Sequence, residues 1–335
     1  MKVNIVGCGI SGIVSAILLQ EKGHSVEIFE TRPHIGGNCY DSLLNGIRVH
    51  NYGAHIFHTN DDDVWHFLNR YTSFNQYVHK VEAHTKDRDI IPIPFNDISA
   101  SIVGEKSEDE IVDLLFREYT HKHWGIPYDD MPKSITNRNN LKKIRREGDD
   151  CRYFLDKYQG IPENGYTAMF EAMLDGVTVH TGVGPDEWRK YMDGLWNCDL
   201  LVYTGKADAF FKYCYGELPY RSLTWEYAIE ERKNVTVLNE CNSFNKYTRT
   251  VDHSHWHDQD PGYTVVSREY ACEHDGKNIP IYPKPFGEGQ KLYSKYKKLA
   301  ESHPNVLFLG RLATYKYLDM WMAVKQVMVK LRGLE

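Results

Sequence analysis

The 335-residue sequence has no apolar run near 18 residues, and its mean hydropathy is -0.54. A helix that crosses a bilayer needs about 20 predominantly apolar residues, so we expect no membrane-spanning segment and no membrane partner. Basic residues are not in excess, because 40 lysines and arginines stand against 46 aspartates and glutamates. The net charge of -6 argues against a nucleic-acid partner, although a local basic pocket for a phosphate is compatible with it.

The seven cysteines are scattered and include no C-x-x-C pair. Disulfide frameworks and structural zinc sites have short, regular spacings, so we interpret these residues as reduced thiols. The N-terminal residues run directly into a predicted strand, which leaves no room for the charged and apolar regions of a signal peptide. Both features predict a cytoplasmic protein.

Tyrosine, in contrast, is abundant, with 23 residues, and 41% of the chain is hydrophobic. At about 100 to 200 residues per domain, this length predicts two domains or one domain with insertions. Such a chain has enough apolar material for a buried core.

The first 30 residues have the pattern of a βαβ unit. Residues 2–6 and 25–29 are short apolar runs typical of strands, and residues 13–19 form an apolar helical stretch. The sequence GCGISG lies between the first strand and the helix, as in dinucleotide-binding folds. The candidate residues of this loop, together with the acid that ends the second strand, are Gly7, Gly9, Ile10, Ser11, Gly12 and Glu30.

Each part of this loop has its own physical role. Gly7 permits a tight turn, Gly9 lets the backbone approach a pyrophosphate, and Gly12 lets the helix pack on the strand. The helix N-terminus adds free N–H groups and a positive dipole, and Glu30 can accept hydrogen bonds from a ribose. The alternative interpretation is an ordinary tight turn between a strand and a helix.

A second glycine pair favours flavin over nicotinamide. After Glu30 the chain continues through an arginine to two adjacent glycines, where the backbone can again approach a pyrophosphate. This Glu-x-Arg-x-x-x-Gly-Gly run resembles FAD-binding proteins of the glutathione-reductase and amine-oxidase type. FAD is therefore the predicted cofactor, and the run adds the candidate cofactor residues Thr31, Arg32, Gly36, Gly37 and Asn38.

Further pieces of the cofactor domain follow much later in the chain. Residues 177–181, 200–203 and 306–309 have strand patterns, and residues 319–331 carry one apolar helical stripe. We predict an α/β fold with a discontinuous Rossmann-like FAD-binding domain, a shortened helical insertion and an antiparallel β-sheet domain. The predicted boundaries are 1–75, 165–208 and 300–335 for the FAD-binding domain, 97–150 for the helical insertion, and 76–96 plus 209–299 for the sheet domain.

The insertions have local signals of their own. Ser107 and Glu110 form a capping box ahead of an apolar helix. Residues 247–251 and 263–266 have the alternation of half-buried strands.

Three histidines alternate with other residues in the sequence DHSHWHD, at His253, His255 and His257. On a strand they would share one face, where imidazoles can ligate zinc or iron. The alternative is a polar strand that faces solvent or lines a substrate site. Because no carboxylate or cysteine partner is separately indicated, we predict no metal.

Residues 51–59, NYGAHIFHT, combine small residues with His55 and His58. The glycine and alanine allow a close approach of the backbone, and two histidines three apart are not typical of a core element. A loop packed against a flavin ring would explain this pattern. The alternative for either histidine alone is a core residue with satisfied hydrogen bonds.

Several arginines could bind a phosphorylated ligand, because guanidinium groups suit the oxygens of a diphosphate. Each of them alone could equally be a surface or ion-pair residue. The residues by themselves thus predict an FAD protein with a second phosphorylated ligand. The candidate arginines are Arg146, Arg221, Arg249 and Arg311.

An ordered series of motifs along essentially the whole chain resembles the prokaryotic UDP-galactopyranose mutases, which are flavin-dependent pyranose–furanose mutases. The resemblance implies an isomerase that acts on a nucleotide sugar. After the glycine loop the motifs are HIGGN, YGAHIFHT, PIPFN, YTHKHWG, YQGIP, GYT, YRSL, YTR, SREY, IYP and GRLATYKYLDM.

The resemblance also implies covalent catalysis on reduced FAD. In the family, N5 of the flavin attacks the anomeric carbon and UDP leaves. The sugar then opens, closes as a furanose, and is released when UDP returns. The flavin must first be reduced by an external reductant such as NAD(P)H.

Positions that match the family's motifs are the predicted site residues. The implied catalytic residues are Arg146, Arg221, His55 and His58. The implied substrate-binding residues are Tyr119, Trp124, Tyr158, Arg249, Glu269, Tyr282 and Tyr317. The resemblance adds as cofactor-binding residues His55, Ile56, Arg311, Tyr317, Leu318, Asp319 and Met320.

The sequence also departs from the family's pattern. The helical insertion is short. In the family this insertion contacts uridine and forms a dimer surface, so we expect a homodimer but do not predict how its subunits are arranged. The expected substrate is therefore UDP-galactopyranose or a relative such as UDP-arabinopyranose, UDP-N-acetylgalactosamine or a dTDP-linked deoxysugar. The competing functions are an amine-oxidase-like FAD oxidoreductase and a non-catalytic flavoprotein that binds a nucleotide sugar.

Overall fold

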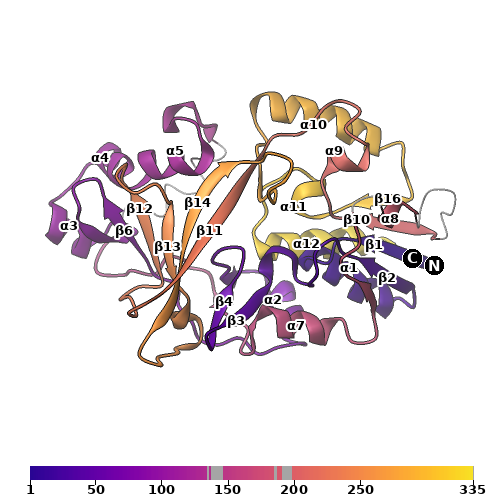
Figure 1. The fold of residues 1–335 in the computed structure, drawn as a ribbon, viewed down its shortest axis with the longest axis horizontal. Coiled ribbons are helices and arrows are strands. Elements are labelled where there is room, and N and C mark those ends of the chain that lie inside the picture. Colours follow the sequence, from indigo (N-terminus) through magenta and orange to yellow (C-terminus); the bar gives the residue numbers. More distant parts are fainter. Residues whose placement is uncertain (134–135, 137–145, 185–186, 191–197, 335) are drawn as a thin grey trace.

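Two β-sheets lie side by side along the long axis of the protein (Figure 1). The structure is a computed structural model that describes residues 1–133, 136, 146–184, 187–190 and 198–334. The sheet near both termini is parallel and flanked by helices, whereas the other is mostly antiparallel. The predicted α/β class with a Rossmann-like domain is confirmed.

The parallel sheet has the strand order β16-β10-β1-β2-β9. Its central strands are buried on both faces, as is usual for parallel sheets. Its strands are β1 (Lys2–Val6), β2 (Ser25–Phe29), β9 (Thr178–His180), β10 (Leu200–Tyr203) and β16 (Val306–Phe308). Helix α1 (Ile10–Glu21) follows β1 and packs against the C-terminal helix α12 (Met320–Leu331). Segments from the start, middle and end of the chain thus meet in one sheet.

The second sheet has the order β15-β11-β14-β13-β12-β6-β7. All of its pairs are antiparallel except that of β12 with β6, which is parallel. The strands are β6 (Val81–Thr85), β7 (Ile90–Ile93), β11 (Tyr220–Glu230), β12 (Val237–Cys241), β13 (Arg249–Asp252), β14 (Thr264–Glu273) and β15 (Tyr282–Pro283).

Short helices cover the outer end of the second sheet (Figure 1). They are α3 (Asp97–Val103), α4 (Glu108–Val112), the π-helical turn η2 (Asp113–Arg117), α5 (Glu118–Trp124) and the 3₁₀ turn η3 (Tyr128–Asp130). The capping box of Ser107 and Glu110 starts α4, as predicted.

The remaining elements surround the parallel sheet and connect it to the second sheet. The hairpin strands are β3 (Asp41–Leu44) and β4 (Ile47–His50), and β5 (Phe57–Thr59) pairs with β8 (Tyr158–Gly160). The helices are α2 (Asp62–Leu68), α7 (Gly165–Met173), α8 (Glu187–Lys190), α9 (Ala207–Phe210), α10 (Gly287–Ala300) and α11 (Gly310–Ala313), with 3₁₀ turns η1 (Gly37–Cys39) and η4 (His253–His257).

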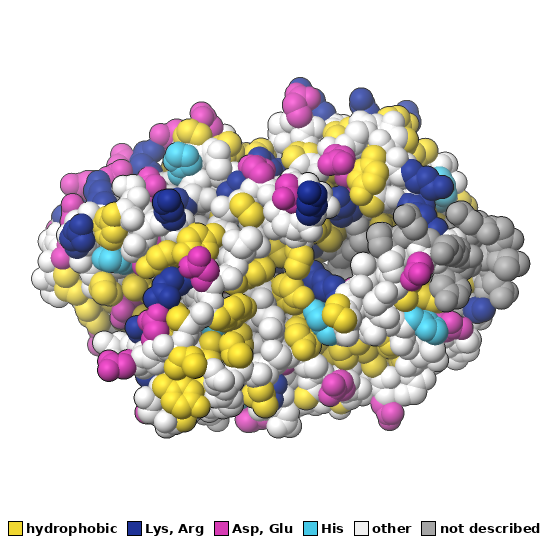
Figure 2. All heavy atoms as spheres, viewed as in Figure 1, with side chains coloured by type: hydrophobic (Ala, Val, Ile, Leu, Met, Phe, Trp, Pro, Cys, Tyr) yellow, Lys and Arg dark blue, Asp and Glu magenta, His cyan; other side chains and the backbone are white. Residues whose placement is uncertain are grey.

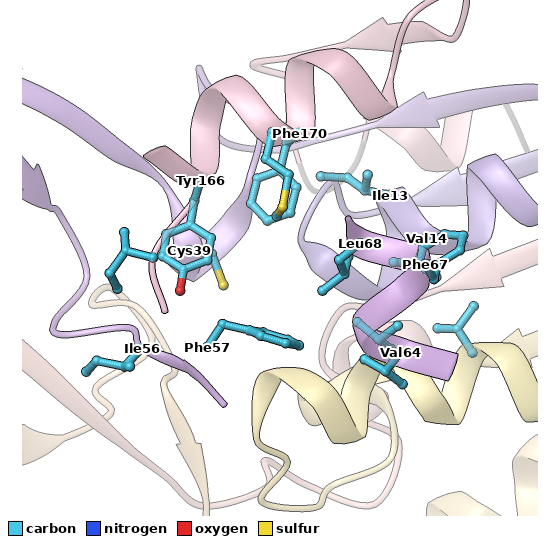
Figure 3. Packing of buried hydrophobic residues seen from close by; sticks show 14 of the residues in the cluster. Ile13, Val14, Cys39, Ile56, Phe57, Val64, Phe67, Leu68, Tyr166 and Phe170 are labelled. Atoms are coloured by element: carbon cyan, nitrogen blue, oxygen red, sulfur yellow. The ribbon is translucent and has the colours of Figure 1, made fainter. Parts of the chain in front are cut away.

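A buried apolar cluster joins the histidine segment 51–59 to the parallel-sheet domain. Figure 3 shows Phe57 between Tyr166 of α7 and Val64 of α2, with Ile13 of α1 nearby. All four side chains are fully or almost fully buried. The core therefore fixes the chain between His55 and His58.

One local prediction was wrong. Residues 253–257 form a 3₁₀ turn and not a strand, because the Asp252 side chain accepts the amide of Ser254 and caps the turn. The three histidines consequently do not share a face. No helix among the described residues is long and apolar enough to cross a bilayer.

Candidate active site

Two glycine segments meet at the N-terminus of α1, and we call Gly7, Gly9, Gly36 and Gly37 the glycine cradle. Gly9 forms a parallel bridge with Gly36, and a Cβ on Gly37 would lie 2.8 Å from Cα of Gly9. Gly7 has a φ of 99°, in the left-handed region that favours glycine. The cradle is thus bare backbone, which leaves the first turn of α1, with Ile10 and Ser11, open to a phosphate.

Gly12 is required by packing. A Cβ at this position would lie 2.0 Å from the carbonyl oxygen of Gly7, so the helix could not approach the turn as closely with any other residue. This close approach is the role predicted for the third glycine of the loop.

The charged residues beside the cradle suit a dinucleotide. The buried Glu30 carboxylate accepts hydrogen bonds from the amides of Cys8 at 2.6 Å and Arg32 at 2.8 Å. Arg32 lies over the Tyr52 ring and donates from Nη2 to Asn38 at 2.8 Å. Its Nη1 is buried and has no hydrogen-bond partner among the described residues. A free guanidinium N–H beside a helix N-terminus fits the pyrophosphate of FAD, whereas the neighbouring Thr31 is exposed.

A cavity of about 640 Å³ lies between the second sheet, α5 and the N-terminus of α12. Figure 2 shows that this side of the molecule is hollowed near its middle, with basic and histidine side chains at the rim. Twelve of the predicted site residues, including most of the catalytic and substrate-binding ones, line the cavity. They are His55, Ile56, His58, Tyr119, Trp124, Arg249, Glu269, Tyr282, Arg311, Tyr317, Asp319 and Met320.

One wall of the cavity is a row of side chains on neighbouring strands. We call Asn239, Arg249 and Glu269 the sheet wall. Asn239 is paired in register with Arg249, and Arg249 with Glu269. Nε of Arg249 lies 2.8 Å from Oε2 of the buried Glu269. Oδ1 of Asn239, Nε of Arg249 and Oε1 of Glu269 are buried and form no hydrogen bond among the described residues. Unsatisfied buried polar atoms are rare, so this row is built to meet a polar ligand or ordered water.

His55 enters the cavity as a neutral ring. Its Nδ1 lies 2.7 Å from the carbonyl oxygen of Gly53, and its amide donates to Nδ1 of His50 at 3.1 Å. Burial lowers the pKa of His55 to about 4. Since a carbonyl only accepts, Nδ1 carries the proton and Nε2 has the lone pair.

His58 is held by a carboxylate that the sequence did not indicate. Its Nδ1 lies 3.0 Å from Oδ2 of Asp156, and its ring stacks on Phe154 with centroids 3.7 Å apart. Asp156 and Phe154 also line the cavity. The carboxylate orients the imidazole, as in other histidine sites where the second nitrogen does the work.

Aromatic rings and a cation form a second wall. The rings of Tyr282 and Tyr317 are stacked, with centroids 5.7 Å apart. Arg311 lies over both rings and donates to the carbonyl oxygen of Leu318 at 2.7 Å. Burial raises the pKa of Tyr282 to about 12, so its hydroxyl remains a hydrogen-bond donor at neutral pH.

Helix α5 supplies the third wall, with Tyr119, His123 and Trp124. His123 lies against Tyr282 with ring centroids 4.9 Å apart. Burial lowers the pKa of His123 to about 3, and burial raises the pKa of Tyr119. This wall is therefore uncharged at neutral pH.

Three of the predicted catalytic and substrate-binding residues do not line the cavity. Arg146 donates to the carbonyl oxygen of Arg152 at 2.6 Å and lies 3.4 Å from Asp150. Tyr158 stacks on Trp65 and donates to Asp62 at 2.9 Å.

Arg221 is the third. It is buried beneath α5, where its guanidinium group binds two backbone carbonyls and Glu273. The resemblance therefore assigned to a ligand two arginines and a tyrosine that in this structure bind parts of the protein.

In the described part of the chain, no group of three or more histidine, cysteine, aspartate or glutamate residues could hold a metal ion. His253 is instead buried, with Nε2 2.8 Å from the Ser267 hydroxyl and Nδ1 accepting the indole N–H of Trp256. His255 lies 2.9 Å from the carbonyl oxygen of Lys233.

Comparison with known proteins decides the family. The model of the UDP-galactopyranose mutase family matches residues 114–317. The chain belongs to the UDP-galactopyranose mutase family. The model of an NAD(P)-binding Rossmann-like domain matches residues 5–71, which contain the glycine cradle.

Relatives match over nearly the full length of this mutase. A dTDP-fucopyranose mutase of Escherichia coli is 32% identical, over 97% of this chain and 96% of the relative. A probable UDP-galactopyranose mutase of Klebsiella pneumoniae is 33% identical, over 97% of this chain and 92% of the relative. A crystal structure of reduced UDP-galactopyranose mutase has the same fold, with a TM-score of 0.71, 15% identity, and coverage of 100% of this chain and 94% of that one.

The chain is therefore an isomerase and a pyranose–furanose mutase with a flavin-type Rossmann domain. This assignment favours the mutase over the predicted alternative of an amine-oxidase-like oxidoreductase, with which it shares the glycine loop.

Proposed function

We propose that this mutase acts on a nucleotide sugar, with UDP-galactopyranose or a close relative such as a dTDP-linked deoxysugar as its substrate. The observation that carries the proposal is the cavity, which places cationic, polar and aromatic side chains on three walls around one space. The names of the relatives, which include both a UDP-galactopyranose and a dTDP-fucopyranose mutase, support this class of substrate.

FAD is the proposed cofactor. The backbone of the glycine cradle and Nη1 of Arg32 would hold the pyrophosphate, and the remaining lone pairs of Glu30 would accept the ribose hydroxyls. When bound in its reduced state, the flavin supplies a nucleophile for the anomeric carbon without net oxidation of the sugar. An external reductant such as NAD(P)H would prepare that state.

Arg249 is the proposed partner of the diphosphate. Glu269 forms an ion pair with its Nε, and we expect the terminal Nη groups to bind the phosphate oxygens. A fixed guanidinium group stabilises the charge that develops when the diphosphate leaves the sugar. Tyr282 and Tyr317 would donate hydrogen bonds to the same group, because burial keeps the Tyr282 hydroxyl protonated.

Two groups are proposed to move or hold protons. Opening and reclosing a sugar ring requires a proton to reach the ring oxygen and another to leave a hydroxyl. His55 offers the Nε2 lone pair as an acceptor, and His58 is oriented by Asp156. Tyr119 and Trp124 on α5 would pack against the nucleotide, and the three walls would exclude water.

A product assay tests this proposal. FAD-loaded protein, reduced with dithionite, is incubated with UDP-galactopyranose, UDP-arabinopyranose, UDP-N-acetylgalactosamine and dTDP-fucopyranose, and the pyranose and furanose forms are separated. We expect conversion of at least one of them to an equilibrium mixture. If every substrate is recovered unchanged by protein that retains its flavin, the substrate claim fails.

A further inference from the structure

The guanidinium group of Arg221 is fully engaged within the protein. Nε donates to the carbonyl oxygen of His123 at 2.8 Å, and Nη2 donates to that of Lys122 at 3.0 Å. Nη1 donates to Oε1 of Glu273 at 2.8 Å, and only 5% of the side chain is exposed. Each of its three nitrogens has a partner, and none of those partners requires a ligand.

The two carbonyls belong to the last turn of α5. Carbonyls at a helix C-terminus have no partner within the helix, and a cation there is favoured by the helix dipole. Gly125, which caps the C-terminus of α5, has a φ of 73°. Arg221 thus serves as a side-chain cap from a neighbouring strand.

Gly125 lets the arginine come this close. A Cβ on Gly125 would lie 2.9 Å from Nη1 of Arg221 and 3.2 Å from Oε1 of Glu273. The glycine is therefore required both by the left-handed turn and by the packing of the Arg221–Glu273 pair.

Glu273 holds the arginine from outside the cavity. It ends β14, is 59% exposed, and also lies 3.3 Å from Nζ of Lys284. Neither Arg221 nor Glu273 lines the cavity, but Tyr119, His123 and Trp124 of α5 do. Any displacement of the last turn of α5 would therefore move a wall of the cavity.

We infer that Arg221 is a positioning residue and not a ligand of the diphosphate. Together with Glu273 it fastens the C-terminal turn of α5 to strands β11 and β14, and so places the aromatic wall that meets the nucleotide. The ligand part of this inference rests on the proposed function, whereas the effect on α5 does not.

A ligand role and a positioning role of Arg221 predict different effects on the binding of UDP and UMP. A residue that contacts the diphosphate contributes more to UDP than to UMP, because UMP lacks one phosphate. A residue that places an aromatic wall contributes equally to both. The ratio of the UMP and UDP dissociation constants therefore separates the two roles.

The test uses the full FAD-loaded chain and two measurements. Amide hydrogen exchange of a peptide covering 118–124 reports on α5 without any ligand, and calorimetry gives the dissociation constants of UMP and UDP. The variants are Arg221→Gln, Glu273→Gln and Arg249→Gln. The matched control is Arg268→Gln, a β14 arginine paired with Glu230 outside the cavity.

For Arg221→Gln we expect faster exchange in 118–124 and a roughly tenfold weaker binding of both nucleotides, with an unchanged ratio. Glu273→Gln should change both measurements in the same direction but less. Arg249→Gln should leave the exchange unchanged and weaken UDP more than UMP. Arg268→Gln should change neither.

The inference would be overturned if the 118–124 peptide of Arg221→Gln exchanged at the wild-type rate, or if this variant bound UDP more weakly but UMP as well as the wild type does. If Arg221→Gln does not fold, Glu273→Gln decides, since its exposed side chain can be replaced without opening a core. If the wild-type protein binds neither nucleotide, the proposed function fails, and the exchange measurement still tests the position of α5.

Discussion

The glycine cradle and the sheet wall are built in opposite ways. The cradle consists of backbone, comes from two short segments within the first 37 residues, and depends on the absence of side chains. The sheet wall consists of side chains, comes from three strands spread over residues 237–273, and depends on their register. The comparison teaches that the cradle is sensitive to added side-chain atoms, above all at Gly7 and Gly37, whereas the wall is sensitive to lost charge.

The largest expected effect concerns the charge on the wall. Arg249→Gln should lower kcat/KM by about 100-fold to 1,000-fold, because a neutral amide cannot stabilise the leaving diphosphate. The flavin should remain bound, since the cradle lies elsewhere. Steady-state kinetics and the flavin absorbance measure the two effects.

The control for this change is Arg268→Gln, which removes an arginine from the same sheet but outside the cavity. Its kcat/KM should stay within about twofold of wild type, because the pair is partly buried and does not line the cavity. An Arg249→Gln enzyme within tenfold of wild type would show that the wall does not work as proposed.

The next effect concerns Gly12, whose close packing supports the cradle at Gly7. Gly12→Ala should lower the free energy of unfolding by about 2 to 3 kcal/mol and impair FAD binding, because its Cβ would lie 2.0 Å from a backbone oxygen. Urea unfolding and the flavin content of the purified protein measure this.

Gly23→Ala is the matched control for Gly12→Ala. Gly23 has a φ of 81°, but no atom lies within 4 Å of the added Cβ. This change should cost about 1 kcal/mol and leave FAD bound. Equal flavin loss in both variants would contradict the packing role of Gly12.

The cavity is lined by titratable histidines, whereas the glycine cradle contains no titratable side chain. The pKa of His55 is about 4 and that of His123 about 3 in the folded protein, both below the ordinary value of 6.5 because of burial. Between the folded-state pKa of each histidine and 6.5, the unfolded chain binds more protons than the folded chain. The stabilisation is therefore complete above pH 6.5 and is lost as the pH drops toward 4. At pH 5 each histidine should have lost about 2 kcal/mol of stabilisation.

Urea unfolding at pH 5 and pH 7.5 measures this pH dependence. His123→Leu should reduce the difference between the two pH values, because it removes one buried imidazole. His66→Gln, at an exposed position, should leave it unchanged. The same difference in wild type and His123→Leu would contradict the burial argument for this residue.

The smallest effects compare two tyrosines. Tyr282→Phe removes a hydroxyl from the cavity and should lower kcat/KM about tenfold. Tyr158→Phe removes one that binds Asp62 on the surface and should change kcat/KM less than about twofold. If Tyr158→Phe were the more damaging change, the boundary of the cavity would be wrong.

The cradle could be predicted from sequence because its determinants are local. Gly7, Gly9 and Gly12 follow one strand and start one helix, and the strands form where they were predicted. The capping box of Ser107 and Glu110 is equally local. In these cases a few neighbouring residues fix the backbone.

The sheet wall could be predicted only in part, because register depends on distant residues. Arg249 and Glu269 were predicted from the family's motifs, but Asn239 lies in no motif and becomes visible only through its pairing with Arg249. Asp156 was missed for the same reason, since it meets His58 from 98 positions away.

One error had an identifiable physical cause. The histidine strand was wrong because Asp252 caps a 3₁₀ turn, and an aspartate two residues before Ser254 was a local signal for that turn. The hydrogen bonds of Arg221 to the free carbonyls of α5 could not be predicted, because no sequence motif reveals them.

Turnover by the same preparation in its two redox states tests the central claim most directly. FAD-loaded protein is given one nucleotide pyranose in air, and again after reduction with dithionite without oxygen, while furanose and hydrogen peroxide are measured. We predict furanose only from the reduced protein and no peroxide from either. Consumption of the pyranose by the oxidised protein with release of peroxide would contradict a flavin-dependent mutase.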